Sequence, residues 1–386
     1  MTLDTLDALV VGCGIGGLAS AICLAQRGAA VRILEQAPHL TEVGAGLQVS
    51  PNGYAVLDAL GLSEELLACS VQPDVVHMID YKGTPIVRLP LSRGADRRYC
   101  LVHRADLLDL LLRRAREAGV EILLSQPVAG VEPGPPARVT TEAGETFSAS
   151  LVVGADGLHS LARTALNTDS DSFFTGQVAW RALVPEHDAA PDVRLFMGPR
   201  RHLVSYPIRN GQLRNIVAVH ERSAWARESW SQQDDPISLR QAFADFAPEV
   251  TGLLSRVETV HLWGLFRHPV AARWHGGALA LLGDAAHPTL PFMAQGANLA
   301  LEDAWVLADA VSRAATLDAG LAAYQARRQA RARRAVEAAN RNAGYYHLSR
   351  PVLRWAMHRS MRAAETLRPG SLIGRFDWLY RHDVTA

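Results

Sequence analysis

A glycine-rich turn near the start of the chain limits the possible folds more than any other feature. In the stretch VVGCGIGGLASA, Gly12, Gly14 and Gly17 follow the spacing G-x-G-x-x-G. An apolar run precedes these glycines and a helix-forming segment follows them, which is the arrangement of a βαβ unit. In such a unit the first glycine permits a tight turn, the second lets the backbone approach a pyrophosphate, and the third lets helix and strand pack closely. The predicted elements are a strand at 6–11, a helix at 15–27 and a second strand at 30–34.

An acidic residue at the end of the second predicted strand supports dinucleotide binding. Glu35 occupies this place, and a carboxylate there can bind the hydroxyls of a ribose. The helix that follows the glycines directs its free N–H groups toward an anion. The motif suits NAD and FAD equally well, so this unit predicts a dinucleotide without deciding which one.

Two later segments repeat the order of strand, glycine and acid. The stretch LVVGADGLHSLAR carries Asp156, and LALLGDAAHP carries Asp284. A single turn of this kind also occurs as an ordinary Asx turn or helix cap. Three of them, with a β-rich block between the second and third, indicate a ligand-binding half that opens the chain, is interrupted, and resumes.

Composition excludes several classes of partner. Basic and acidic residues balance at 39 each, so no nucleic-acid or anionic-membrane partner is predicted. The four cysteines show no metal-ligand spacing, so no metal site is predicted, and they fit reduced thiols. Asp4 and Asp7 stand where a signal peptide would carry positive charge, and no uncharged run approaches the roughly 20 residues of a membrane span. We therefore expect a cytoplasmic protein. Its expected oligomeric state is a monomer or a homodimer.

Together these motifs resemble those of the single-component FAD-dependent aromatic hydroxylases, the group of the p-hydroxybenzoate, salicylate and 6-hydroxynicotinate hydroxylases. The resemblance runs from Gly12 to about Ala339 and includes GAGLQVSPN, HRADL and GDAAHPTLPFMAQGANLALEDA. It implies FAD as cofactor, NADH or NADPH as co-substrate, and a flavin C4a-hydroperoxide formed with O2. The implied substrate is a small hydroxylated aromatic or N-heteroaromatic compound, expected to be a carboxylic acid.

The implied fold class is α/β, with a Rossmann-like FAD-binding domain, an inserted and mostly antiparallel β-sheet substrate domain, and a C-terminal helical segment. The β-rich block shows short apolar stretches separated by turns such as Asn210-Gly211, with a helical insert at 237–254. The expected domains are the first part of the FAD-binding domain at 1–172, the substrate sheet at 173–268, the second part of the FAD-binding domain at 269–340 and a helical tail at 341–386.

The resemblance also assigns residues to the cofactor. The three glycines would hold the pyrophosphate, Glu35 the adenosine ribose, and Asp284 the ribityl chain or pyrophosphate. The segment from Gly296 opens a helix whose N–H groups would face the N1–C2=O edge of the flavin, where the helix dipole stabilises negative charge. The remaining assignments are Arg104 along the dinucleotide, the backbone of Val128 near the adenine, Asp156 at both FAD and NAD(P)H, and Ala297 and Asn298 beside the flavin.

The substrate pocket is expected between the sheet and the flavin ring, walled by alternate strand positions. Tyr206 and His220 are the candidates for orienting or deprotonating a phenolic substrate, with a sheet-edge role as the alternative for each. Gln48 and Arg181 are expected to border the substrate, with Arg181 a candidate partner for a carboxylate. The carbonyl of Pro291 is expected beside the flavin edge where oxygen is activated.

One position departs from the pattern of the resembled family. Several relatives that act on salicylate or hydroxynicotinate carry a histidine where this chain has Phe292. A phenylalanine takes no proton, so an acceptor is expected from the sheet side. The alternatives left open are a flavin monooxygenase or epoxidase acting on a polyketide or quinone-type substrate, a non-catalytic flavin-binding sensor, and a plain NAD dehydrogenase.

Overall fold

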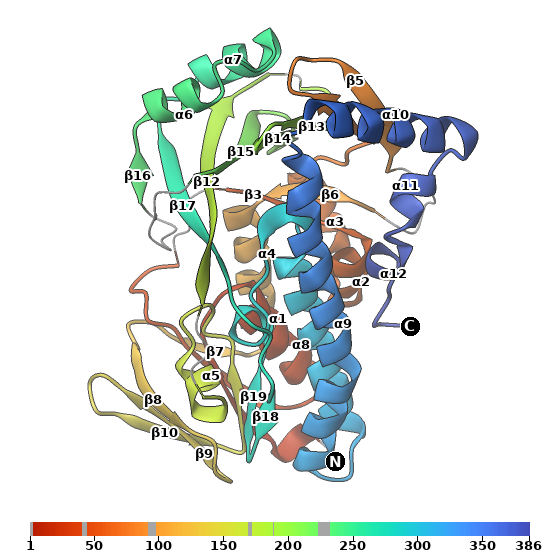
Figure 1. Ribbon diagram of the computed structural model, residues 1–386. Coiled ribbons are helices and arrows are strands. Elements are labelled where there is room, and N and C mark those ends of the chain that lie inside the picture. Colours follow the sequence, from red (N-terminus) through yellow and green to blue (C-terminus); the bar gives the residue numbers. More distant parts are fainter. Residues whose placement is uncertain (1–2, 41–44, 92–97, 169–171, 188, 223–231) are drawn as a thin grey trace.

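Two large β-sheets, two smaller ones and the helices that cover them make up the fold (Figure 1). The computed structural model describes residues 3–40, 45–91, 98–168, 172–187, 189–222 and 232–386. The chain starts in the first sheet, passes to the second and back twice, and ends in helices. The predicted interruption of one half of the molecule by a sheet is therefore present.

The first sheet has six strands in the order β18-β19-β11-β1-β2-β7. All neighbours pair in parallel except β18 and β19. Its central strands are buried apolar runs, because helices and the three-stranded sheet at 128–149 pack against them. The carboxyl ends of the parallel strands therefore place the three strand–glycine turns at one edge. The strands are β1 (Asp7–Val11), β2 (Ala30–Leu34), β7 (Glu121–Leu123), β11 (Leu151–Gly154), β18 (His275–Gly276) and β19 (Leu279–Leu281).

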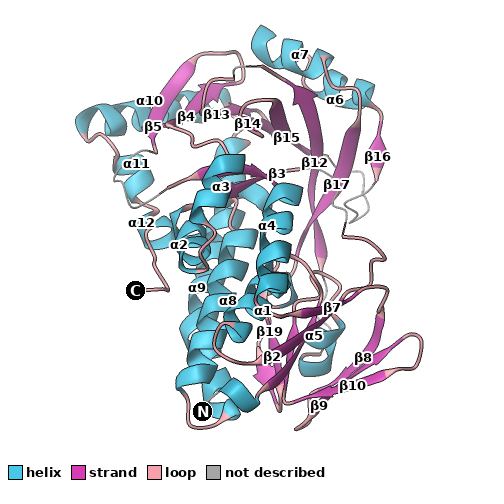
Figure 2. Ribbon diagram, turned by 180° about the vertical axis from the view of Figure 1, so that it is seen from behind, coloured by secondary structure: helices cyan, strands magenta, loops and turns pink. Residues whose placement is uncertain are grey.

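Long helices pack against this sheet and against one another (Figure 2). Helix α1 (Ile15–Ala25) contacts both α8 (Gly296–Arg313) and α4 (Arg104–Glu117), and α8 contacts the long helix α9 (Leu317–Tyr346). The interface of α1 and α8 is lined by small and apolar side chains, which lets the two helices approach closely. The N-terminus of α8 thereby lies at the same edge as the glycine loop.

The second sheet has eight strands in the order β16-β17-β12-β15-β14-β13-β4-β5. Its pairings are antiparallel except for β13 with β4. One face packs on α6 (Pro236–Ala242) and α7 (Pro248–Ser255), which form a separate apolar core. The strands are β4 (Val75–Asp80), β5 (Pro85–Pro90), β12 (Phe173–Pro185), β13 (Asp192–Gly198), β14 (Arg201–Ile208), β15 (Leu213–Glu221), β16 (Gln233–Asp234) and β17 (Val260–Arg267).

The α/β class with an inserted, mostly antiparallel sheet is confirmed, but the expected boundaries need correction. Strands β4 and β5 belong to the second sheet although they lie within 1–172. Helix α9 crosses the expected boundary at 340 and ends at Tyr346. The helical insert expected at 237–254 consists of two helices, and Pro248 begins the second, α7. Local patterns locate strands well but do not show which sheet a strand joins.

Smaller elements complete the chain. Within the described residues, no helix has both the length and the apolar character needed to cross a bilayer. The last helices, from α10 onward, lie beside β5 and the N-terminal helices (Figure 1). The remaining elements are β3 (Gly46–Val49), β6 (Cys100–His103), β8 (Val128–Glu132), β9 (Ala137–Thr141), β10 (Thr146–Ala149), α2 (Pro51–Ala59), α3 (Ser63–Cys69), α5 (Leu161–Leu166), α10 (Pro351–Leu367), α11 (Ser371–Gly374), α12 (Asp377–Tyr380), and the 3-10 turns η1 (Leu3–Thr5), η2 (Gly283–Ala285) and η3 (Pro291–Met293).

Candidate active site

The three glycines of the first motif are needed for three different reasons. Gly12 has φ +100°, and a Cβ on it would lie 2.5 Å from the carbonyl oxygen of Ala155. A Cβ on Gly17 would lie 2.0 Å from the carbonyl oxygen of Gly12. A Cβ on Gly14 would meet no atom within 4 Å. Protein packing therefore demands the first and third glycines, whereas the second leaves room for something outside the protein.

A cavity of about 280 Å³ lies between the first sheet and the open face of the second. Gly14 and the N-terminus of α8 line one part of it, and strands β12, β14, β15 and β17 line another. The segment from Pro288 to Ala297 follows its wall almost without a break. Of the residues predicted for ligand binding or catalysis, those that line the cavity are Gly14, Gln48, Arg104, Arg181, Tyr206, Asp284, Pro291, Phe292, Gly296 and Ala297.

Asp284 supplies an acceptor to this cavity. Its side chain is open to the cavity. Desolvation by the surrounding protein raises the pKa of its carboxyl, while His287 and Arg104 act in the opposite direction. Gly296 and Ala297 begin α8, so their backbone N–H groups have no partner within the helix. Donors and an acceptor thus converge on one stretch of the wall.

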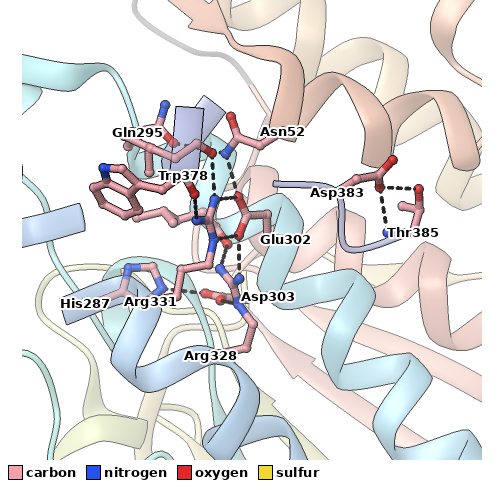
Figure 3. A network of polar contacts seen from close by, with 12 residues as sticks. Asn52, His287, Gln295, Glu302, Asp303, Arg328, Arg331, Trp378, Asp383 and Thr385 are labelled. Carbon is pink, nitrogen blue, oxygen red and sulfur yellow. Dashed lines mark hydrogen bonds and ion pairs between the residues drawn. The ribbon is translucent and has the colours of Figure 1, made fainter. Parts of the chain in front are cut away.

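A buried charged network holds the N-terminal half of α8 in place (Figure 3). Glu302 binds Arg328 and Arg331, while Asp303 binds Arg328, His287 and the backbone N–H of Gly283. Glu302 and Asp303 are fully buried. Burial alone would raise the pKa of Asp303, but His287 and Arg328 outweigh it and lower that pKa to about 2. The network fixes α8 relative to the turn that carries Asp284.

Asn298 stabilises the same part of the cavity wall by hydrogen bonds. Its side-chain oxygen accepts a hydrogen bond from the N–H of Ser50 at 3.0 Å, and its amide donates to the carbonyl of Gln48 at 2.9 Å. It does not line the cavity. The Asn298 side chain thus joins α8 to the strand that carries Gln48, and its expected place beside the flavin stays a prediction.

Three other residues predicted for the dinucleotide do not line the cavity. Glu35 accepts hydrogen bonds from the backbone N–H groups of Cys13 and Ala37. Asp156 accepts from the Ser160 hydroxyl and from the N–H of Ala162, so it binds the N-cap residue and the first turn of α5. Val128 begins β8 in a separate three-stranded sheet. Roles for these three at the dinucleotide stay predictions.

The expectation that His220 faces the ligand cavity is wrong. The ring of His220 stacks on Trp180 at 6.0 Å between centroids, and Trp180 packs into the core beneath α6 and α7. His220 shares this face with Ile216 and Ala218, whereas Val217 and Val219 line the cavity. Nearby arginines add to the effect of burial and lower the pKa of His220 to about 4. Strand alternation was read correctly, but the period of two does not tell which set of residues faces the ligand.

The histidine that does line the cavity is His202, on the neighbouring strand β14. It stands four residues before Tyr206 on β14, so the two share one face of the strand. Its ring lies 5.6 Å from that of Phe292 between centroids, and burial lowers its pKa well below the ordinary value. The alternation that selected Tyr206 also contained His202, so the signal was present.

Tyr206 and Gln48 lie close together on the cavity wall. Burial raises the pKa of Tyr206 to about 12, opposed in part by Arg181 and by a hydrogen bond with Gln48. The side-chain oxygen of Gln48 also accepts a hydrogen bond from the Tyr99 hydroxyl at 2.7 Å. At neutral pH the Tyr206 hydroxyl therefore keeps its proton. It can donate or accept a hydrogen bond, but it does not act as a base.

The comparisons with known proteins fit this geometry. The family described as FAD binding domain matches residues 5–339. A 3-amino-4-hydroxybenzoate 2-monooxygenase from Streptomyces cremeus is 35% identical over 383 residues, covering 96% of this chain and 94% of that protein. The protein belongs to the family of FAD-dependent aromatic hydroxylases. A 3-hydroxybenzoate 6-hydroxylase from Polaromonas naphthalenivorans is 35% identical over 321 residues, covering 79% of each chain. The structure of HpxO from Klebsiella pneumoniae with FAD and uric acid matches with a TM-score of 0.83 at 25% identity, covering 94% of each chain.

Membership of the aromatic hydroxylases makes this chain an FAD-dependent monooxygenase with NAD(P)H as co-substrate. It removes the plain NAD dehydrogenase and the non-catalytic sensor from the alternatives. The cavity has the donor set that FAD requires. The space beside Gly14 admits a phosphate, Asp284 suits a hydroxyl-rich ribityl chain, and the N–H groups at the start of α8 suit a ring edge that gains negative charge.

Proposed function

We propose that this enzyme hydroxylates a small aromatic carboxylic acid that carries a ring hydroxyl group. The observation that carries the proposal is the continuity of one cavity from the glycine loop to the open face of the second sheet. A cofactor held at Gly14 and Asp284 would meet, within the same space, a surface with few polar groups. Such a surface positions an apolar ring and fixes its orientation at a small number of points.

The cofactor would be held by the residues whose geometry suits it. Gly14 and the start of α1 would take the pyrophosphate, Asp284 the ribityl hydroxyls, and Gly296 and Ala297 the flavin edge. Bound FAD supplies the oxygen-activating chemistry, with electrons from NAD(P)H. Glu35 and Asp156, which bind neighbouring backbone in the structure, stay proposals for the adenosine and NAD(P)H contacts.

The sheet side would orient the substrate. Val217 and Val219 provide an apolar wall, and Arg181 is the cationic residue on that wall that suits a carboxylate. Tyr206 would hold a polar ring substituent by a hydrogen bond. His202, neutral at pH 7 because burial lowers its pKa, would accept the proton of the ring hydroxyl. Pro291 lines the cavity, but its carbonyl already accepts a hydrogen bond from Ala294 at 3.2 Å, so a contact with activated oxygen is a proposal only.

Relatives support the acid class. Their names specify hydroxybenzoates and an aminohydroxybenzoate.

The proposal is tested by measuring NADH and NADPH oxidation by the FAD-bound enzyme in the presence of 3-hydroxybenzoate, 3-amino-4-hydroxybenzoate or 6-hydroxynicotinate. Released H2O2 is measured separately and the product identified by mass. We expect at least one acid to accelerate oxidation and to gain one oxygen atom. Oxidation that yields only H2O2 with every acid would reject the proposal.

A second cavity favours a larger substrate as the alternative. It measures about 300 Å³, has mostly apolar walls, and shares Gln48, Val204, Pro291, Phe292 and Ala294 with the first. A polyketide or quinone-type molecule with an apolar extension would reach into it. Adding two-ring acids and quinols to the same panel tests this alternative.

We also retain a cytoplasmic location in the proposal, because all four cysteines are free thiols and three of them are buried.

A further inference from the structure

A chain of three titratable side chains leads from the cavity to the surface. The Nδ1 atom of His202 lies 2.6 Å from the Nε2 atom of His347, and the Nδ1 atom of His347 lies 2.9 Å from a carboxylate oxygen of Glu221. His202 lines the cavity, and His347 is buried. The side chain of Glu221 is 32% exposed and contacts Arg200, which is itself largely exposed. One continuous path of polar atoms therefore joins the ligand space to solvent.

Donor and acceptor requirements fix the protons along this chain. Hydrogen bonding to His347 lowers the pKa of Glu221, so its carboxylate is ionised and can only accept. The Nδ1 atom of His347 must then carry a proton. In neutral His347 the Nε2 atom is an acceptor, so the Nδ1 atom of His202 is the donor in the bond between the two rings. The Nε2 atom of His202 is left without a proton, as a base facing the cavity requires.

If His202 took up a proton by itself, holding the positive charge at this buried place would have a high energetic cost. Besides His347, whose ring centroid lies 4.9 Å away, the rings around His202 are those of Phe292 and Tyr346, at 5.6 and 5.2 Å between centroids, and these two carry no charge at neutral pH. Among the described residues, His347 is the titratable side chain that acts on His202, so a cation on His202 would have no anionic partner there. A cation on His347 would lie directly against the Glu221 carboxylate.

We propose that His347 and Glu221 form a proton-transfer chain that lets His202 take the proton of the substrate hydroxyl without holding a positive charge. The proposal rests on the proposed function, since it uses the hydroxyl of an aromatic substrate. The substrate O–H bond breaks, and its proton binds the Nε2 atom of His202. The proton on the Nδ1 atom of His202 moves to the Nε2 atom of His347. The substrate becomes a phenolate, His347 becomes an imidazolium paired with Glu221, and its proton leaves through Glu221 to water.

The arrangement itself is tested without substrate. Nitrogen-15 NMR of the FAD-bound protein labelled at histidine should show neutral His202 with its proton on Nδ1, with signals assigned by the His202→Gln and His347→Gln variants. Neutral His202 carrying its proton on Nε2 while His347 is also neutral would overturn the proposed chain.

The proton transfer is tested by mixing the FAD-bound enzyme with 3-hydroxybenzoate in weak buffer that contains a pH indicator. We expect His347→Gln and Glu221→Gln to slow proton release roughly tenfold or more, on the scale of a lost acid–base step. Glu221→Asp, which keeps a carboxylate, should recover part of the rate, and added imidazole should restore release in His347→Gly. His220→Ala is the matched control, because it neighbours Glu221 on β15 but faces the opposite side of the sheet.

Three outcomes separate the possibilities. Slow release with imidazole rescue supports the chain, and release at the wild-type rate in both Gln variants overturns it. If neither 3-hydroxybenzoate nor the other acids change the flavin absorbance of the wild type, the proposed function fails and takes the substrate step with it. The NMR measurement still decides whether the three side chains are arranged as a proton path.

Discussion

At the scale of single residues, Gly14 separates ligand binding from folding. A Cβ there meets no protein atom within 4 Å, and its φ of −75° suits any residue. Gly14→Val should therefore fold normally but lose FAD, because the branched side chain fills space beside the phosphate. The measurement is flavin absorbance per protein after gel filtration, with circular dichroism as the check on folding. Gly130→Val, also at an open position, is the control and should stay yellow. A stoichiometric yellow Gly14→Val protein would show that the cofactor lies elsewhere.

The two histidines on neighbouring strands give a second test at this scale. His202→Gln should slow hydroxylation by roughly 10²–10⁴, the usual effect of losing an acid–base group, while NAD(P)H still reduces the flavin. The fraction of electrons released as H2O2 should rise. His220→Ala should hydroxylate as the wild type does, because its ring packs on Trp180 away from the cavity. Stopped-flow reduction and product yield on the best acid of the panel distinguish the steps. The reverse pattern would return the base to His220.

At the scale of elements, the buried ion pairs between α8 and α9 should make the free energy of unfolding fall at acid pH. The pKa of Asp303 is about 2 in the folded protein, below its ordinary value of 3.8. Because this pKa is lower in the folded protein than in the unfolded chain, the ionised carboxylate stabilises the fold at pH values above about 4. This stabilisation is lost as the pH falls from about 4 toward 2. The full effect is about 2 kcal/mol. Urea unfolding of the FAD-saturated protein over this pH range measures it.

Variants of the same helix sharpen this prediction. Asp303→Asn should cost about 3–5 kcal/mol at pH 7, because Arg328 and His287 keep their burial and lose a charged partner. It should also flatten the fall in stability between pH 4 and pH 2. Asp309→Asn, which breaks more exposed ion pairs on α8, should cost about 1 kcal/mol or less. Equal losses in the two variants would show that the buried network adds nothing specific.

At the scale of the whole molecule, Phe292 lies where two cavities meet. It lines both the cavity beside the second sheet and the one toward α11 and α12. Phe292→Ala should join them, so that two-ring acids become substrates and small acids release more H2O2. The lost ring should also cost about 3–5 kcal/mol of stability. Product mass over the acid panel is the measurement, and Phe292→Leu, which keeps most of the volume, is the control. Unchanged preference in Phe292→Ala would place the substrate away from this wall.

The sequence by itself determined the ligand-binding half of the molecule. A turn beside a phosphate needs glycine, and an open position at the end of a buried strand needs an acid when it meets hydroxyls. These demands are local, so short segments were enough to select Gly12, Gly14, Gly17 and Asp284 as candidates, and their roles at the cofactor stay predictions. The βαβ unit at 6–34 and the β-rich block were also predictable, because buried strands and amphipathic helices have their own periods.

Only the tertiary structure decided which residues share a space. Alternation in β15 selected two sets of side chains, and the packing of α6 and α7 against one face left the other, with Val217 and Val219, for the cavity. His347 follows α9, far along the chain from the strands that carry His202 and Glu221, so no local pattern could join the three. The same holds for β4 and β5, which enter the second sheet across a long separation in sequence. Contacts between distant segments arise from burying apolar faces together, and a single sequence records the faces but not their partners.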